Sequence, residues 1–332
     1  MADDDIATRA PESDAQEAAP TETSSAIPGD SRVDQGPASM GEHCTTDRPT
    51  PLGETPTGEM TKFADVDTYI TKPADYPHSP CKLLLLLTGG TGVHSTNNQL
   101  QADKYAAEGF LVVMPDQFAG DHAPGNAVST ETPEENQSLI DQVKQGISAV
   151  AKSFTIDMWL ARHTPEKVLP HLHRVLKAVA EEFADAIASG GGVYTVGYCF
   201  GAKYALLLST PPGKEDVAGE NADDSKVEEG RVQDLPKIKA GAIAHGTQIT
   251  KEDFDGVAAP MFVVAVEDDP LFPEEVRIDG VKKMKENGLE CEEKVYPGVP
   301  HGFAVLGDYQ DSKIVESQKD AFEQMLGWLK AH

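Results

Sequence analysis

Residues 81–92 read CKLLLLLTGGTG, an unbroken apolar run that ends in glycines. A strand with one face in water would alternate apolar and polar side chains, so this run predicts a strand that is covered on both faces. Such strands occur mainly in parallel sheets packed between two layers of helices. The run is far shorter than the roughly 20 apolar residues that a helix needs to cross a bilayer. The segment therefore indicates an α/β protein.

Similar apolar segments recur along the chain and alternate with helical patterns. Strands are predicted at 110–116, 192–198, 239–246, 259–269 and 291–297, and helices at 95–109, 164–191, 201–210, 274–287 and 313–330. Within the long helix, we expect Pro170 to interrupt the first turns. Upstream, residues 55–73 alternate in a way that predicts one or two antiparallel strands at a sheet edge. The whole pattern predicts one α/β domain, with a mostly parallel central sheet and helices on both faces.

Composition sets the limits of that domain. Residues 1–40 are acidic and contain few aliphatic side chains, so they are predicted to form a disordered acidic tail. The folded domain is placed at 41–332, with an acidic insert at 211–230 that is predicted to be a flexible surface loop. Residues 117–135 are rich in Gly, Pro and Asp, and unstructured loops of that length in compact domains are often functional.

Charge and cysteine usage restrict the partners. The net charge of −27 argues against a nucleic-acid backbone or an anionic membrane surface as the main partner. The first residues lack the basic and apolar regions of a signal peptide. The four cysteines, Cys44, Cys81, Cys199 and Cys291, show no zinc-ligand spacing and are expected to be reduced thiols. We therefore expect a cytoplasmic monomer or homodimer that uses no metal and no cofactor, and that binds neither nucleic acid nor membrane.

Residues 196–205, VGYCFGAKYA, place Cys199 between two glycines at a predicted strand-to-helix junction. This is the order of the nucleophile elbow of hydrolases, with cysteine in the position that serine usually holds. Gly197 and Gly201 would relieve crowding around a strained turn, and the helix N-terminus would favour a thiolate and an oxyanion. This stretch alone leaves open the alternative of a small buried cysteine that has glycine neighbours.

An acid and a histidine follow in the order that such an elbow requires. The segment VVAVEDDPLFP ends a predicted strand with Glu267, Asp268 and Asp269, and YPGVPHGF places His301 directly after the next strand. The imidazole would take the proton of the thiol or pair with the thiolate, while a carboxylate would fix the imidazole tautomer. The alternative is a surface histidine with three solvated acids.

An oxyanion hole needs two backbone N–H groups. One would come from Phe200, the residue after the nucleophile, and the other from the loop TGGTG at 88–92, where Gly90 is the best candidate. The competing interpretation of this loop is phosphate binding. The segment GGTGVH has neither the Walker lysine nor a GxGxxG spacing, which disfavours that interpretation.

Several motifs in this order resemble the dienelactone hydrolase family, particularly its fungal-type members. They are GYCFGAKY, DDPLFP, YPGVPHGFAVLGD, GETPTGEMTKFADVDTYITKP, NNQLQADKYAAEGFLVVMPDQFAGD and MWLARHTPEKVLP, and the similarity covers about residues 41–331. The resemblance implies an α/β-hydrolase fold and a Cys–Asp–His triad that hydrolyses esters or lactones without a cofactor. It implies Cys199 as nucleophile, His301 as base and Asp269 as acid, because the family's aspartate stands four positions before a proline, as Asp269 stands before Pro273.

Two departures from the bacterial members bear on the substrate. Gly89 holds the position of a glutamate that contacts the resting thiol, and Val305 holds that of an arginine that binds the substrate carboxylate. Both departures favour a less acidic ester or lactone over dienelactone itself. His245 and Trp159 are further candidates for lining the substrate pocket, with a packing or surface role as the alternative for each.

The sequence therefore predicts a cysteine hydrolase that acts on small esters or lactones through a thioester intermediate. The alternative from another class is a non-catalytic binding or adaptor protein that has retained the hydrolase fold. A redox sensor based on the thiol is a third interpretation, for which the sequence offers no nearby resolving cysteine.

Overall fold

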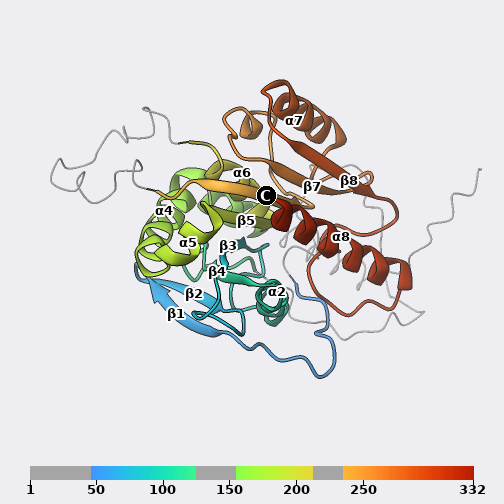
Figure 1. Cartoon of the computed structure of the whole chain (residues 1–332). Helices are drawn as coiled ribbons and strands as arrows, with labels where there is room; N and C mark the ends of the chain where they lie inside the picture. Colours follow the sequence, from blue (N-terminus) through green and yellow to red (C-terminus); the bar gives the residue numbers. More distant parts are fainter. Residues whose placement is uncertain (1–45, 125–154, 212–234) are drawn as a thin grey trace, which may run out of the picture. The chain divides into compact units, whose positions relative to one another are not determined.

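The computed structural model describes residues 46–124, 155–211 and 235–332 (Figure 1). In these residues one sheet contains β1 (Glu59–Phe63), β2 (Val66–Thr71), β3 (Lys82–Leu87), β4 (Phe110–Pro115), β5 (Val193–Tyr198), β6 (Ile238–Ala244), β7 (Met261–Val266) and β8 (Cys291–Tyr296). The strand order across the sheet is β1-β2-β4-β3-β5-β6-β7-β8. The edge strands β1 and β2 are antiparallel, β2 is antiparallel to β4, and the remaining pairs are parallel. The predicted mostly parallel sheet is confirmed.

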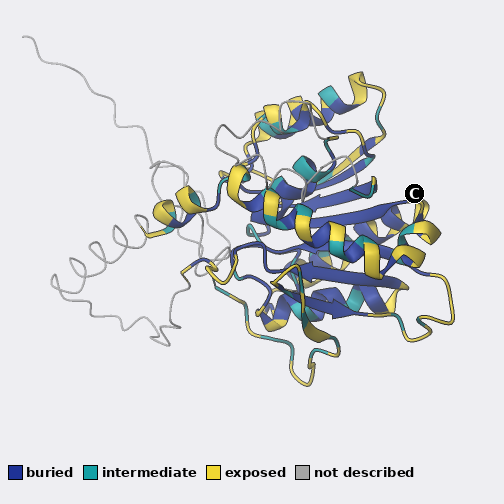
Figure 2. Ribbon diagram, turned by 90° about the vertical axis from the view of Figure 1, so that its left-hand side faces the viewer, coloured by how far each residue is buried: buried dark blue, intermediate teal, exposed yellow. Residues whose placement is uncertain are grey.

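Helices cover both faces of this sheet, as Figure 2 shows by the buried strands and the exposed outer sides of the helices. The helices are α2 (Thr96–Ala107), α4 (Pro165–Glu182), α5 (Ala184–Gly190), α6 (Phe200–Leu208), α7 (Glu274–Glu286) and α8 (Ser312–Ala331), with a 3₁₀ turn η3 at Glu252–Phe254. One core contains residues of α2 and α8, and the other contains residues of α4 to α7. Successive leucines of β3 alternate between these two cores, which explains why the run at 83–87 is apolar throughout.

The predicted long helix at 164–191 differs from the structure in two respects. It is two helices, because the chain leaves the helical conformation at Phe183, with φ −117° and ψ 39°. Pro170 lies inside α4 and does not interrupt it. A proline removes one backbone hydrogen bond. The buried face of the helix, which includes Val168, Leu172 and Val175, packs on the core and stabilises α4 despite that loss.

Some predictions concern residues that the structure does not describe. The acidic tail at 1–40, residues 125–135 of the predicted loop and residues 212–230 of the predicted insert lie outside the described residues. None of the helices in the described ranges is long and apolar enough to span a membrane. Cys81, Cys199 and Cys291 are buried and form no disulfide within the described residues, and Cys44 is outside them.

The parallel strands determine where side chains can meet. The segments that follow β3, β5, β6, β7 and β8 all leave the sheet at its carboxyl edge, because these strands run in the same direction. In α/β proteins this is the edge at which ligands bind. Cys199, His245, Asp269 and His301 each lie in such a segment.

Candidate active site

Cys199 occupies a strained turn between β5 and α6. Its φ of 51° and ψ of −115° are values that residues other than glycine rarely adopt. Two backbone hydrogen bonds hold this conformation: the Cys199 N–H donates to the carbonyl of Ala244 at 3.0 Å, and the Cys199 carbonyl accepts from the Thr247 N–H at 3.1 Å. The turn therefore depends on the segment that follows β6 as well as on its own glycines.

The two glycines of the elbow allow backbone segments to approach each other closely. A Cβ atom at Gly197 would lie 2.5 Å from the carbonyl oxygen of Gly201. A Cβ atom at Gly201 would clash with the Leu87 carbonyl and lie 2.8 Å from that of Thr88. Since both obstacles are backbone atoms, a side chain at either position would displace the nucleophile or the loop that follows β3.

His301 connects a buried carboxylate to the neighbourhood of the Cys199 sulfur. Its Nδ1 lies 2.7 Å from Asp269 Oδ2, and the second oxygen of Asp269 accepts the Leu271 N–H at 3.0 Å. On the opposite side of the ring, His301 Nε2 is 3.4 Å from Thr247 Oγ1, which in turn is 3.5 Å from Cys199 Sγ. The carboxylate beside Nδ1 favours a proton on that nitrogen, so Nε2 faces the sulfur side.

The structure separates the three consecutive acids that the sequence presented. Asp269 is buried, with none of its side chain exposed, whereas Glu267 and Asp268 are exposed. Asp269 alone of the three contacts the imidazole of His301 through a hydrogen bond described in the structure.

The surroundings of His301 stabilise its charged form. Burial lowers the pKa of His301, but the hydrogen bonds with Asp269 and Cys199, and the attraction of their negative charges, outweigh this and raise the pKa to about 10. The imidazole therefore carries a proton at neutral pH. A cation next to a cysteine favours the thiolate, which is the nucleophilic form.

The loop that follows β3 approaches the nucleophile closely. A Cβ atom at Gly89 would lie 3.2 Å from Cys199 Cβ and 3.7 Å from its sulfur, so a larger residue would contact the thiol directly. Two hydrogen bonds fix the loop: Gln117 Nε2 donates to the Thr88 carbonyl and the Ala123 N–H donates to the Gly90 carbonyl, each at 2.9 Å. This loop carries Gly90, while Phe200 begins α6 immediately after Cys199.

A pocket above Cys199 contains three of the four residues that the sequence suggested for substrate contact, namely Gly89, His245 and Val305. The His245 ring is fully buried, with its centroid 5.0 Å from that of His301. Other lining residues that sequence reasoning did not select are Thr46, Asp47, Arg48, Thr91, Asn97, Asn98, Gly302, Leu306 and Tyr309.

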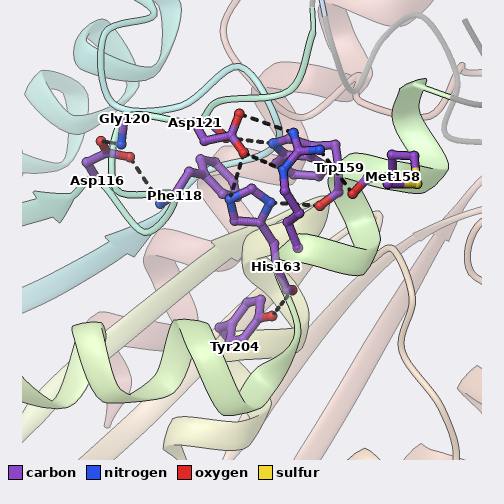
Figure 3. A network of polar contacts seen from close by, with 9 residues as sticks. Asp116, Phe118, Gly120, Asp121, Met158, Trp159, His163 and Tyr204 are labelled. Carbon is purple, nitrogen blue, oxygen red and sulfur yellow. Dashed lines mark hydrogen bonds and ion pairs between the residues drawn. The ribbon is translucent and has the colours of Figure 1, made fainter.

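Trp159, the fourth suggested residue, is not among the described residues that line this pocket. Trp159 is fully buried, and its ring centroid lies 5.1 Å from that of Phe200, the residue after the nucleophile, and 5.0 Å from that of Phe118. Its Nε1 donates to the Asp121 carbonyl at 2.6 Å, and Figure 3 shows the polar network around it. In that network His163 lies 3.8 Å from the Asp121 carboxylate. Trp159 therefore has a packing role, since its ring contacts the ring of Phe200 in the core.

Thr247 is a site residue that sequence reasoning missed. It lies two residues after His245 and is only 1% exposed, and its hydroxyl contacts both Cys199 and His301. The signal that could have identified Thr247 from the sequence is its position: it follows β6 and therefore lies at the carboxyl edge of the sheet.

Thr247→Val preserves the shape of the side chain but removes the hydroxyl. We expect kcat/KM for a small ester to fall roughly threefold to tenfold, because one neutral hydrogen bond contributes about 0.5–1.5 kcal/mol. Initial rates with 4-nitrophenyl butanoate measure this. A loss above about 1,000-fold would contradict the expectation and would place the hydroxyl on the route of the proton.

The model of the dienelactone hydrolase family matches residues 66–219 and 231–332. The chain belongs to this family. Hydrolase pyvD of Aspergillus violaceofuscus is 28% identical over 280 residues, which are 84% of this chain and 92% of that protein. Hydrolase tropI of Talaromyces stipitatus is 27% identical over 285 residues, which are 83% and 91% of the two chains.

Among solved structures, a candidate dienelactone hydrolase from Klebsiella pneumoniae has the same fold. It aligns with a TM-score of 0.53 at 16% identity, over 84% of this chain and all of that one. Membership in the dienelactone hydrolase family makes this chain a hydrolase that acts on carboxylic ester or lactone bonds.

Proposed function

We propose that this dienelactone hydrolase family member is a cysteine hydrolase of small esters or lactones, with Cys199 as nucleophile, His301 as acid and base, and Asp269 as the group that orients His301. The series of contacts from Asp269 through His301 to the sulfur at the elbow carries this proposal. Serine and cysteine hydrolases on unrelated folds share this division of roles, so the geometry supports it independently of family membership.

In the proposed reaction the Cys199 thiolate attacks the carbonyl carbon. The N–H groups of Phe200 and Gly90 stabilise the oxyanion of the tetrahedral intermediate. When that intermediate collapses, the proton on His301 Nε2 passes to the leaving alkoxide, and a thioester on Cys199 remains. His301 then removes a proton from a water that attacks the thioester. The carboxylic acid product leaves, and the Cys199 thiolate is regenerated beside protonated His301.

The pH dependence of thiol alkylation tests the proposed ion pair. We expect the rate at which iodoacetamide alkylates Cys199 to rise less between pH 6 and 8 than that of an ordinary thiol, because the pKa of His301 is raised to about 10 and its positive charge favours the thiolate throughout this range. In His301→Gln the thiol should titrate near its usual pKa of about 8.5, so its alkylation at pH 6 should be roughly 100-fold slower than in the wild type.

Mass spectrometry of the peptide that contains Cys199 gives the site-specific rate. Cys81 and Cys291 serve as internal controls, because burial raises the pKa of both thiols, that of Cys291 to about 12. Parallel pH profiles for the wild type and His301→Gln would contradict the ion pair. A Cys199 thiol that is inert at pH 6 would favour the non-catalytic alternative.

A further inference from the structure

Residues 46–49, called here the N-terminal wall, lie before the residues that the family model matches, and residues 46–48 line the pocket above Cys199. Hydrogen bonds fix it to the start of α2, where Ser95 Oγ donates to Asp47 Oδ1 at 2.8 Å and Asn97 Nδ2 donates to the Arg48 carbonyl at 2.7 Å. On its other side, the Asp308 N–H donates to the Pro49 carbonyl at 2.8 Å. The wall is therefore part of the folded site.

Asn97 stands where this wall meets the pocket and is only 1% exposed. The amide orientation is fixed, because the Arg48 carbonyl accepts hydrogen bonds and must face the amide nitrogen. The amide oxygen is then directed elsewhere, and it is buried without a hydrogen-bond donor among the described residues. Leaving a buried acceptor unsatisfied is unfavourable, so a donor on a bound ligand would gain affinity there.

The described lining residues around Asn97 carry one carboxylate, Asp47, and one guanidinium, Arg48, so they offer no excess of positive charge to an anionic substrate group. Asp47 also lines the pocket and adds a carboxylate acceptor. The one cationic side chain among the described lining residues, Arg48, adjoins Asp47 in the chain and lies over the ring of Tyr309, with its guanidinium carbon 5.1 Å from the centroid. Val305, also in the lining, is apolar. The wall therefore offers acceptors that a hydroxyl satisfies and a carboxylate does not.

We infer that the pocket takes a neutral ester or lactone that carries a hydroxyl group, and that this hydroxyl donates its hydrogen bond to Asn97 Oδ1. The inference rests on the proposed function, since it names the substrate class of the same site. Asn97 is a specificity residue in this scheme and takes no part in the proton transfers.

A matched set of lactones tests the inference with the full-length protein. Hydrolysis of γ-butyrolactone, its 2-hydroxy and 3-hydroxy derivatives and its 3-carboxylate is followed by titration of the released acid. We expect kcat/KM for at least one hydroxylated lactone to exceed that of γ-butyrolactone about tenfold or more, and the carboxylate to be the poorest substrate.

Variants separate recognition by Asn97 from its role in holding the wall. Asn97→Leu should lower the ratio of kcat/KM between the hydroxylated lactone and γ-butyrolactone to about 1. Ser95→Ala removes both the hydrogen bond to Asp47 and the N-cap of α2 but keeps the Asn97 side chain, so it should slow both lactones and retain the ratio. If Asn97→Leu slows both lactones equally, Asn97 only tethers the wall and the inference is overturned.

The outcome also distinguishes this inference from the proposed function. Suppose that 4-nitrophenyl butanoate is hydrolysed, that Cys199→Ala abolishes this, and that the wild type shows no preference for a hydroxylated lactone. The inference is then wrong and the proposed function stands. If no compound is hydrolysed in a way that depends on Cys199, both are wrong.

Discussion

Replacing Cys199 with alanine is expected to lower kcat/KM for 4-nitrophenyl butanoate by a factor of about 10⁴ or more. The reason is that the substitution removes the only protein atom that forms a covalent bond with the acyl group in the proposed reaction, while the oxyanion donors and the pocket remain. Initial rates on the purified variant measure the effect, and its melting curve shows whether the fold is retained.

Cys81→Ala is the matched control for this experiment. It also removes a buried thiol, but Cys81 precedes β3 and is not among the residues that line the pocket. Its activity should stay within about twofold of the wild type, and any effect should be on stability, where removal of a buried side chain costs on the order of 1 kcal/mol. A Cys199→Ala variant that retains more than a tenth of the wild-type activity would contradict the assignment of the nucleophile.

Gly201→Ala is expected to produce the largest loss of stability from a single methyl group. The added Cβ would clash with the Leu87 carbonyl, and this backbone cannot turn away as a side chain can. We expect the free energy of unfolding to fall by about 3 kcal/mol or more, as for severe overpacking of a core. Urea denaturation followed by circular dichroism measures it.

Gly327→Ala is the corresponding control, because Gly327 also lies in a helix, α8, and a Cβ atom there would have no neighbour within 4 Å. Alanine should stabilise that helix by about 0.5–1 kcal/mol, since it restricts the unfolded chain more than glycine does. Similar unfolding midpoints for Gly201→Ala and the wild type would show that the elbow can relax, contrary to our account.

The fold was predictable because its signals are local. An unbroken run such as 83–87 and the glycines that follow it indicate a doubly covered strand wherever the rest of the chain lies. The start of α2 is also set locally, since the Ser95 side chain caps this helix by accepting the Asn98 N–H three residues later. The break at Phe183 was missed because the pattern on both sides of it is helical, and only the backbone conformation of that residue separates α4 from α5.

The polar side of the pocket could not be predicted, because it is built from distant segments. The contact between Asn97 and the Arg48 carbonyl joins residues 49 positions apart, and no local pattern signals it. For Trp159 the sequence left a pocket lining and a packing role open, and the choice depends on distant contacts, because Phe118 and Phe200 pack against its ring. Among the acids, the residue pattern left three candidates, and only the family resemblance pointed to Asp269.

Detection of an acyl group on Cys199 by mass spectrometry tests most directly the claim that this residue is the nucleophile. The full-length protein is mixed with excess 4-nitrophenyl butanoate, quenched in acid within the first turnovers and digested for mass spectrometry. The account predicts a butanoyl group, bound as a thioester, on the peptide that contains Cys199, and no such group in Cys199→Ala. Hydrolysis of the ester by the wild type with the acyl group on another residue, or with Cys199 unmodified throughout the burst, would contradict it.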